Sequence, residues 1–188
     1  MSVATSLMEV DPESGLIKGV RFVPSPNCDA RPSSTTIDVL IIHAISLPPG
    51  EFGSAAIEQL FCNQLDPNGH PMFQEICGLQ VSAHVLVRRD GEVIQFVPFH
   101  LRAWHAGESL CEGRVQVNDF SVGVELEGCD ATRFEPVQYS VLSTLTKAIM
   151  VAYPAITRDH IYGHCDIAPA RKTDPGPRFD WPRYLESL

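Results

Sequence analysis

Two near-continuous apolar runs stand out along the chain, IDVLIIHA at residues 37–44 and FSVGVEL at 120–126. Runs of this length, rich in β-branched and other large apolar residues, are typical of strands buried on both faces of a sheet. His43 lies at the end of the first run, so we expect its polar ring at an edge of the sheet, where sites are built. In the second run, strand alternation places two sets of side chains on opposite faces, Val122, Val124 and Leu126 on one, Gly123, Glu125 and Glu127 on the other.

Two further segments have the spacing of amphipathic helices. Residues 54–62 carry apolar side chains three and four positions apart, and a longer segment begins at Pro136 and runs to about Tyr153. Proline suits the first turn of a helix, and Pro154 cannot continue one, so both ends of the longer helix are marked. A short helix is expected from about Asp180.

A hairpin is predicted in the middle of the chain. The β-prone segments 81–88 and 92–97 flank Arg-Asp-Gly at 89–91, and an Asp-Gly turn between such segments is a strong hairpin signal. The order strand, helix, three strands, helix predicts an α/β fold, with a mixed central sheet flanked by helices. We expect one domain over residues 1–188, with 1–19 as an N-terminal lead-in.

Charge and composition narrow the functional classes. The net charge of −9 argues against a nucleic-acid partner, because binding to phosphates needs a basic surface. No apolar stretch approaches the roughly 20 residues that span a bilayer, and the acidic N-terminal segment does not resemble a signal peptide. These features predict a cytoplasmic protein with no membrane partner and no implied protein partner. The six cysteines form no C-x-x-C pair and are expected as free thiols.

Among the seven histidines, two combine with a carboxylate into a candidate metal site. His43 ends a buried strand, His164 follows Gly163 in a stretch without regular period, and Asp174 lies ten positions further on. Two imidazoles and one carboxylate are a usual ligand set for catalytic zinc, which keeps a fourth position open. The spacing alone leaves this open, because a lone histidine is more often structural and no H-E-x-x-H motif is present.

Seven segments, in order along residues 20–188, resemble the AmpD-type 1,6-anhydro-N-acetylmuramyl-L-alanine amidases, within the wider amidase and peptidoglycan-recognition family. The matching segments are VPSPN (23–27), HAISLPPGEFG (43–53), LDPNGHP (65–71), VSAHVLVRRDGEVIQFVPF (81–99), RAWHAG (102–107), NDFSVGVELEG (118–128) and GHCDIAPARKTDPGP (163–177). The resemblance implies a zinc-dependent hydrolase that cuts the amide between the lactyl group of (1,6-anhydro-)N-acetylmuramic acid and L-alanine. Its substrate would be a small muropeptide released during cell-wall degradation and recycled in the cytoplasm.

The resemblance also implies roles for individual residues. One zinc ion per chain would be held by the metal ligands His43, His164 and Asp174. Glu125 would be the general base for the zinc-bound water, and Lys172 would stabilise the oxyanion with the zinc. The substrate groove would be lined by Trp104 and His105.

Structural interpretations stand beside these roles. Glu125 could be an ordinary solvent-facing strand residue, Lys172 could belong to a solvated basic pair with Arg171, and Trp104 could be core. His84 is expected to be structural or to support a ligand. Cys165, beside His164, is not expected to bind the metal.

Two alternative functions remain at this point. Members of the wider family can keep the fold but lose the metal, which would leave a non-catalytic peptidoglycan-recognition module, and a periplasmic amidase would act on the intact wall. The complete set of implied residues disfavours the first, and the missing signal peptide disfavours the second. One departure affects the substrate, since the family commonly has asparagine where this chain has Ala44.

Overall fold

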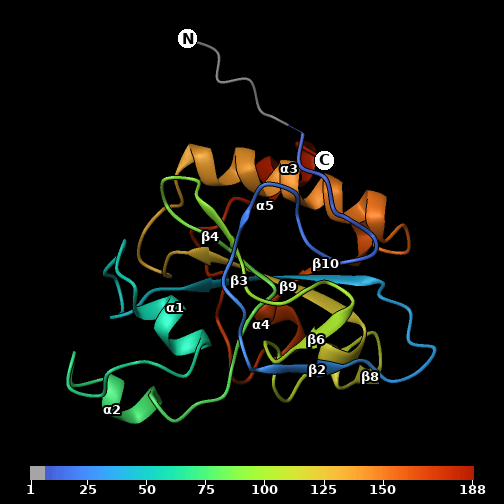
Figure 1. Ribbon diagram of the computed structural model, residues 1–188. Helices are drawn as coiled ribbons and strands as arrows, with labels where there is room; N and C mark the ends of the chain where they lie inside the picture. The colour runs from blue at the N-terminus through green and yellow to red at the C-terminus, as the bar shows by residue number, and fades with distance from the viewer. Residues whose placement is uncertain (1–6) are drawn as a thin grey trace.

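A mixed six-stranded sheet forms the centre of the protein in a computed structural model that describes residues 7–188 (Figure 1). The strand order is β1-β5-β4-β9-β3-β10. The strands are β1 (Arg21–Phe22), β5 (Val93–Gln95), β4 (Val85–Val87), β9 (Ser121–Glu127), β3 (Val39–Ile45) and β10 (Ile161–Gly163).

The two predicted apolar runs are β3 and β9, and they pair in parallel along seven residues, from Val39 opposite Ser121 to Ile45 opposite Glu127. Both strands are buried along most of their length, which explains why apolar residues occupy both of their faces. The pairing places His43 directly opposite Glu125. The sequence expectation for the centre of the sheet is therefore confirmed.

The predicted hairpin is formed by β4 and β5, the antiparallel pair that makes the sheet mixed. Its turn contains Gly91 with φ of 90°, a conformation that favours glycine, and an added Cβ there would lie 2.8 Å from Val137. The paired strands are shorter than the expected segments. Residues 81–84 lie outside β4, and there the backbone N–H groups of Ser82 and His84 donate to the carbonyls of Trp104 and Gly123.

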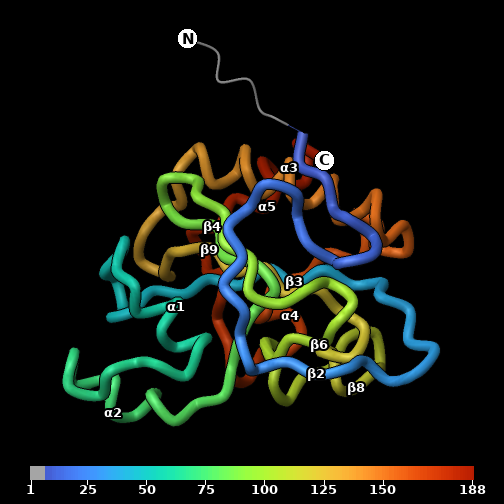
Figure 2. Tube along the Cα trace, in the orientation of Figure 1, coloured from blue at the N-terminus to red at the C-terminus, as the bar shows by residue number. Residues whose placement is uncertain are grey.

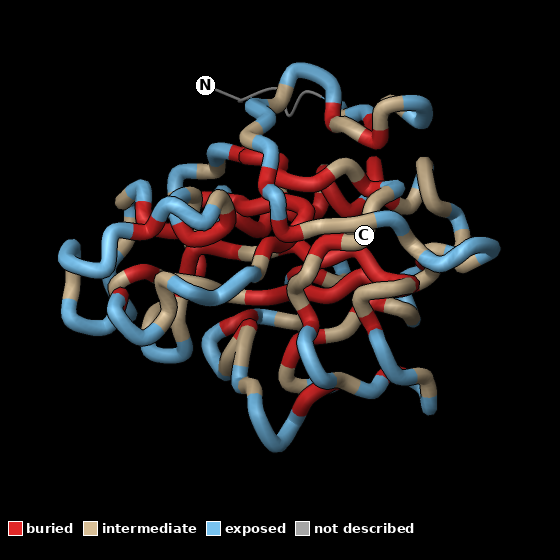
Figure 3. The backbone as a smooth tube through the Cα atoms, turned by 60° about the horizontal axis from the view of Figure 1, so that its bottom comes forward, coloured by how far each residue is buried: buried red, intermediate tan, exposed pale blue. Residues whose placement is uncertain are grey.

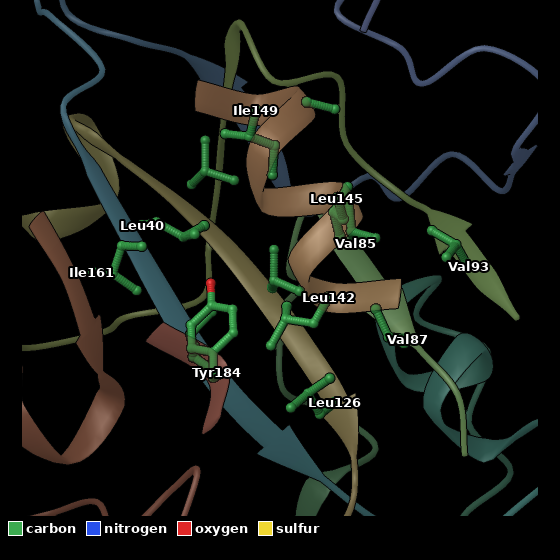
Figure 4. Packing of buried hydrophobic residues seen from close by; sticks show 14 of the residues in the cluster. Leu40, Val85, Val87, Val93, Leu126, Leu142, Leu145, Ile149, Ile161 and Tyr184 are labelled. Carbon is green, nitrogen blue, oxygen red and sulfur yellow. The ribbon is translucent and has the colours of Figure 1, made fainter. Parts of the chain in front are cut away.

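One face of the sheet is covered by α3 (Pro136–Ala152) and α5 (Trp181–Glu186) (Figure 1). A capping box begins α3, in which the side chains of Glu135 and Gln138 bond to each other's backbone N–H groups. Figure 4 shows the resulting packing, in which helix residues meet sheet residues in one apolar cluster. Members of this cluster include Leu142, Leu145 and Ile149 of α3, Tyr184 of α5, and Leu40, Val85 and Leu126 of the sheet.

The opposite face is covered by α1 (Ala56–Phe61) and α4 (His164–Ile167), while α2 (Phe73–Ile76) lies further out (Figures 1 and 2). Two small antiparallel pairs complete the fold, β2 (Cys28–Ala30) with β6 (Leu101–Ala103) and β7 (Leu110–Cys111) with β8 (Arg114–Val115). Single 3-10 turns occur at Val117–Asp119 and Arg158–His160. Buried residues concentrate in the middle of the molecule, and exposed ones in the surrounding loops (Figure 3).

The stretch 163–177 differs from the sequence expectation of a wholly irregular segment. It begins at the end of β10, which pairs in parallel with β3, and continues directly into α4. The remainder is loop. Within residues 7–188, no helix has the length and apolar character to cross a membrane.

Candidate metal centre and active site

Three candidate residues lie near the carboxyl ends of neighbouring parallel strands. His43 is in β3, Glu125 is its partner in β9, and His164 directly follows Gly163, the last residue of β10, which pairs with Ile42. Because Val122, Val124 and Leu126 pack in the cluster under α3, Glu125 points to the other face, where α4 lies. The strand ends therefore gather these three side chains, as open α/β sheets often do at their sites.

Asp174 joins the two histidines from the loop after α4. The backbone of that loop is held to α4 by the Cys165 N–H, which donates to the Asp174 carbonyl at 2.9 Å. Asp174 Oδ2 lies 3.1 Å from His164 Nδ1 and 3.3 Å from His43 Nδ1, and the two Nδ1 atoms are 2.9 Å apart. This is the cluster of potential metal ligands among the described residues, and it consists of the three that the sequence singled out.

The geometry of this triangle fits a tetrahedral metal ion. A zinc ion about 2.0–2.1 Å from each ligand would separate neighbouring ligand atoms by about 3.3 Å, close to the three distances observed. The proton count fits as well. His164 Nε2 lies 3.0 Å from the Ala106 carbonyl oxygen, which can only accept, so neutral His164 presents a lone pair at Nδ1. Among His43 Nδ1, His164 Nδ1 and Asp174 Oδ2, at most one proton, on His43, is then available for hydrogen bonds between them. A divalent cation could instead accept a lone pair from all three atoms.

The electrostatics of the ligand set favour the same protonation states. Burial lowers the pKa of His43 to about 4, against the opposing effect of its hydrogen bond with Asp174, so the ring is neutral at physiological pH. Burial raises the pKa of Asp174, but hydrogen bonds with His164 and His43 outweigh it and hold that pKa well below its usual range. A neutral His43 ring and an ionised Asp174 result, which are the protonation states that metal ligation requires of these two groups.

Glu125 carries a buried carboxylate oxygen that nothing in the described chain contacts by a hydrogen bond. This atom is Oε2, and no donor among residues 7–188 reaches it. Burial is the main reason that the pKa of Glu125 lies well above its usual value, the charge of Asp174 raises it further, and the charge of Lys172 opposes both. A buried carboxylate oxygen without a hydrogen-bond donor is uncommon, so the half-buried Glu125 is a candidate for proton transfer.

Lys172 lies in the same loop as Asp174, and its backbone N–H donates to the Ala168 carbonyl at 2.9 Å. Its side chain is half-buried. The positive charge of its ammonium group lowers the pKa values of both His43 and Glu125. The neighbouring Arg171 is exposed, and its guanidinium donates to the carbonyls of Ala106 and Glu108 at 2.7 and 2.8 Å.

Trp104 and His105, which the resemblance assigned to the groove, have different surroundings. The Trp104 indole is half-buried and donates to Asp29 at 3.2 Å. The His105 ring lies behind His43, with its Nδ1 atom 2.9 Å from His43 Nε2. Burial is the main reason that the pKa of His105 lies well below its usual value. The groove assignment of both residues stays a prediction.

Several residues near the site were not singled out by sequence reasoning. Asn118 Oδ1 accepts from the backbone N–H groups of His105 and Ala106 at 3.2 and 2.8 Å, and Ser121 Oγ lies 3.2 Å from His105 Nε2. The only available signal was their place in the matching segment NDFSVGVELEG. His84 accepts from the Gly123 N–H through Nδ1, at 3.0 Å, and lies 3.1 Å from the Leu101 carbonyl through Nε2, so it connects β9 with β6.

Two other sequence positions are placed by their contacts. Cys165 is outside the ligand cluster, and its thiol lies 3.9 Å from Asp166. Ala44 packs against the cluster under α3, so its side chain lies on the sheet face opposite to Glu125. The side chain at position 44 therefore does not lie on the face of the sheet where the ligand triangle sits.

Comparison with known proteins defines the class of protein. The family described as N-acetylmuramoyl-L-alanine amidase matches residues 33–177. The 1,6-anhydro-N-acetylmuramyl-L-alanine amidase AmpD of Escherichia coli (strain K12) is 54% identical over 172 residues, which cover 92% of this chain and 93% of that protein. This chain therefore belongs to the N-acetylmuramoyl-L-alanine amidase family, a family of hydrolases.

Solved structures agree with the fold. A crystal structure of an AmpD selenomethionine derivative superimposes with a TM-score of 0.91 at 51% identity, over 93% of this chain and 97% of that one. The amidase AmiD from E. coli, in complex with the substrate anhydro-N-acetylmuramic acid-L-Ala-D-γ-Glu-L-Lys, gives a TM-score of 0.58 at 30% identity, over 84% of this chain and 60% of that one. The α/β fold predicted from the sequence is that of this family.

Proposed function

We propose that this chain is a zinc-dependent amidase that hydrolyses the bond between the lactyl group of 1,6-anhydro-N-acetylmuramic acid and L-alanine during peptidoglycan recycling. The observation that carries the proposal is the triangle of His43, His164 and Asp174 at the strand ends beside the unpaired carboxylate of Glu125. Similarity to AmpD over nearly the whole of both chains supports the substrate class. One zinc ion per chain would be held by the three ligands.

Amide hydrolysis needs a nucleophile, a stabilised oxyanion and a protonated leaving amine. A bound zinc ion supplies Lewis-acid chemistry, since it lowers the pKa of water and polarises a carbonyl oxygen. Glu125 acts first as a base, because its free Oε2 can take the proton of the attacking water. A cation beside this carboxyl opposes the effect of burial on its pKa and favours the ionised form that a base needs.

The same carboxyl then acts as an acid. Once protonated, Glu125 can hand its proton to the departing nitrogen of L-alanine, and a half-buried carboxyl with a raised pKa is well suited to hold that proton between the two steps. Lys172 supplies positive charge to the oxyanion that forms on the carbonyl oxygen. The same loop therefore carries the residue that stabilises the oxyanion, Lys172, and a metal ligand, Asp174.

We further infer that the enzyme acts in the cytoplasm on soluble fragments. All six cysteines are free, including the buried Cys111, which is the usual state in a reducing compartment. The net charge of −9 gives no attraction to nucleic acid or to anionic membranes. Cell fractionation with a specific antibody tests this placement directly.

Side-by-side kinetics test the substrate. The purified protein is assayed by mass spectrometry on anhydromuramyl-tripeptide, on muramyl-tripeptide with an ordinary reducing end, and on intact sacculi. We expect the highest kcat/KM on the anhydro compound and little release from sacculi. Asp174→Ala provides the control for contaminating amidases. Equal efficiency on sacculi would identify a wall hydrolase, and binding without hydrolysis of any substrate would identify a recognition module.

A further inference from the structure

The two candidate zinc histidines are both supported from consecutive residues of one segment. The nitrogen of His43 that faces away from the triangle, Nε2, lies 2.9 Å from His105 Nδ1. The corresponding nitrogen of His164 lies 3.0 Å from the carbonyl oxygen of Ala106. The segment Trp104–Gly107 therefore contacts the outer side of both ligands. Partners at this position usually set the tautomer and the ring orientation of a metal-binding histidine.

The hydrogen-bond chain through His105 has only one consistent direction. It ends at the Val117 carbonyl oxygen, which accepts from the Ser121 hydroxyl at 2.6 Å. Since that hydroxyl has one proton and donates it to Val117, its contact with His105 Nε2 at 3.2 Å requires the ring nitrogen to be the donor. His105 Nδ1 then holds a lone pair and accepts from His43 Nε2–H. His43 Nδ1 is left with its lone pair directed toward His164 and Asp174.

The support is itself held in place. Asn118 Oδ1 accepts from the backbone N–H groups of His105 and Ala106, and Arg171 donates to the Ala106 carbonyl. The His105 ring also depends on Gly123 of β9, because an added Cβ at this position would lie 2.5 Å from the ring atom Cγ. The missing side chain in the middle of a buried strand thus provides the space that the ring occupies.

We propose that His105 is a positioning residue, which fixes His43 in the tautomer that presents Nδ1 to zinc and which thereby sets the affinity of the site for the metal. Both nitrogens of the ring are engaged by His43 and Ser121, so neither is free for a polar contact with substrate. The inference rests on the proposed zinc function of His43. It gives His105 a different task from the groove lining that the resemblance implied.

Paired substitutions at one position test the proposal. His105→Asn retains an acceptor near the place of Nδ1, whereas His105→Leu removes it while filling similar space. We expect zinc affinity, measured by competition with a chromogenic chelator, to fall about 10–100-fold in His105→Leu and to be largely restored in His105→Asn. His84→Gln is the matched control, since His84 is also buried and its ring centroid lies 5.7 Å from that of His105, yet it contacts none of the three ligands. That variant should lose stability without losing zinc affinity.

A second measurement does not depend on whether the variants fold. In wild-type protein with ¹⁵N-labelled histidine and bound zinc, NMR should show His105 with its proton on Nε2 and His43 with its proton on Nε2 and its metal on Nδ1. A proton on Nδ1 of His105, or wild-type zinc affinity in folded His105→Leu, overturns the positioning role alone. Failure of the wild-type protein to bind zinc would overturn the proposed function as well, so the two failures are distinguishable.

Discussion

Replacement of Glu125 by glutamine separates catalysis from metal binding more cleanly than any other change in this site. The amide has the shape of the carboxyl group but cannot take a proton from water. Loss of a general base typically slows turnover by about 10²–10⁴-fold, which corresponds to about 2.7–5.4 kcal/mol of transition-state stabilisation. Zinc content should stay at the wild-type level, because Glu125 is outside the ligand triangle.

The structure also predicts the effect of this substitution on stability. Burial holds the pKa of Glu125 in the folded protein well above its ordinary value of 4.5. A carboxyl with a raised pKa stabilises the fold fully below its unfolded pKa, and this contribution is lost as the pH rises through the folded pKa. Metal-free Glu125→Gln should therefore melt at a higher temperature than metal-free wild type at pH 7–8, and the difference should shrink toward pH 4.

Three measurements decide this prediction: zinc by elemental analysis, kcat/KM on anhydromuramyl-tripeptide, and melting of the metal-free proteins across pH. Glu125→Asp is the informative companion, since it keeps the carboxyl but shortens its reach. Near wild-type turnover in Glu125→Gln would refute the reasoning and place the base elsewhere. Loss of zinc from this variant would show that the carboxyl is a ligand.

The remaining predictions concern the surroundings of the site and the core. Cys165→Ser should keep its zinc, whereas Asp174→Ala should lose zinc affinity. Elemental analysis after dialysis measures the zinc content of both variants. Metal loss from the serine variant would mean that the ligand set is wrong. Tyr184→Phe removes the hydroxyl that lies 2.7 Å from the Thr146 hydroxyl in the core and should cost about 1–3 kcal/mol in urea unfolding; an unchanged midpoint would contradict this. Burial, aided by the charge of Arg31, lowers the pKa of His84 from 6.5 to about 3. The neutral ring therefore stabilises the fold fully above pH 6.5. This contribution, at most about 5 kcal/mol, is lost as the pH falls toward 3. His84→Gln should therefore flatten the dependence of unfolding free energy on pH over that range, and an unchanged slope would be inconsistent with a buried neutral ring.

The centre of the fold could be predicted because its signals are local. The runs that form β3 and β9, the Asp-Gly turn of the hairpin and the proline-marked ends of α3 each contain their own information. By contrast, β10 has three residues and becomes a strand only through pairing with Leu40, Ile41 and Ile42 of β3. The helix α4 that follows β10 directly could not be predicted either, because its four residues are too few to show a helical pattern of hydrophobic positions.

The candidate site divides in the same way. The ligand triangle was accessible because zinc chemistry restricts its residue types and because long segments resemble a known family. The position of His105 behind His43 was not accessible, since 62 residues separate them and the contact depends on the absence of a side chain at Gly123. Local patterns carry no information on such an arrangement, which exists only once the strands are in register.

Metal content and activity measured on the same preparation test the central claim most directly. Freshly purified protein should contain about one zinc ion per chain, by the ligand count of the triangle. Removal of the metal with a chelator should abolish cleavage of anhydromuramyl-tripeptide, and stoichiometric zinc should restore it. Full activity in protein verified to be free of zinc and other divalent metals would contradict the account.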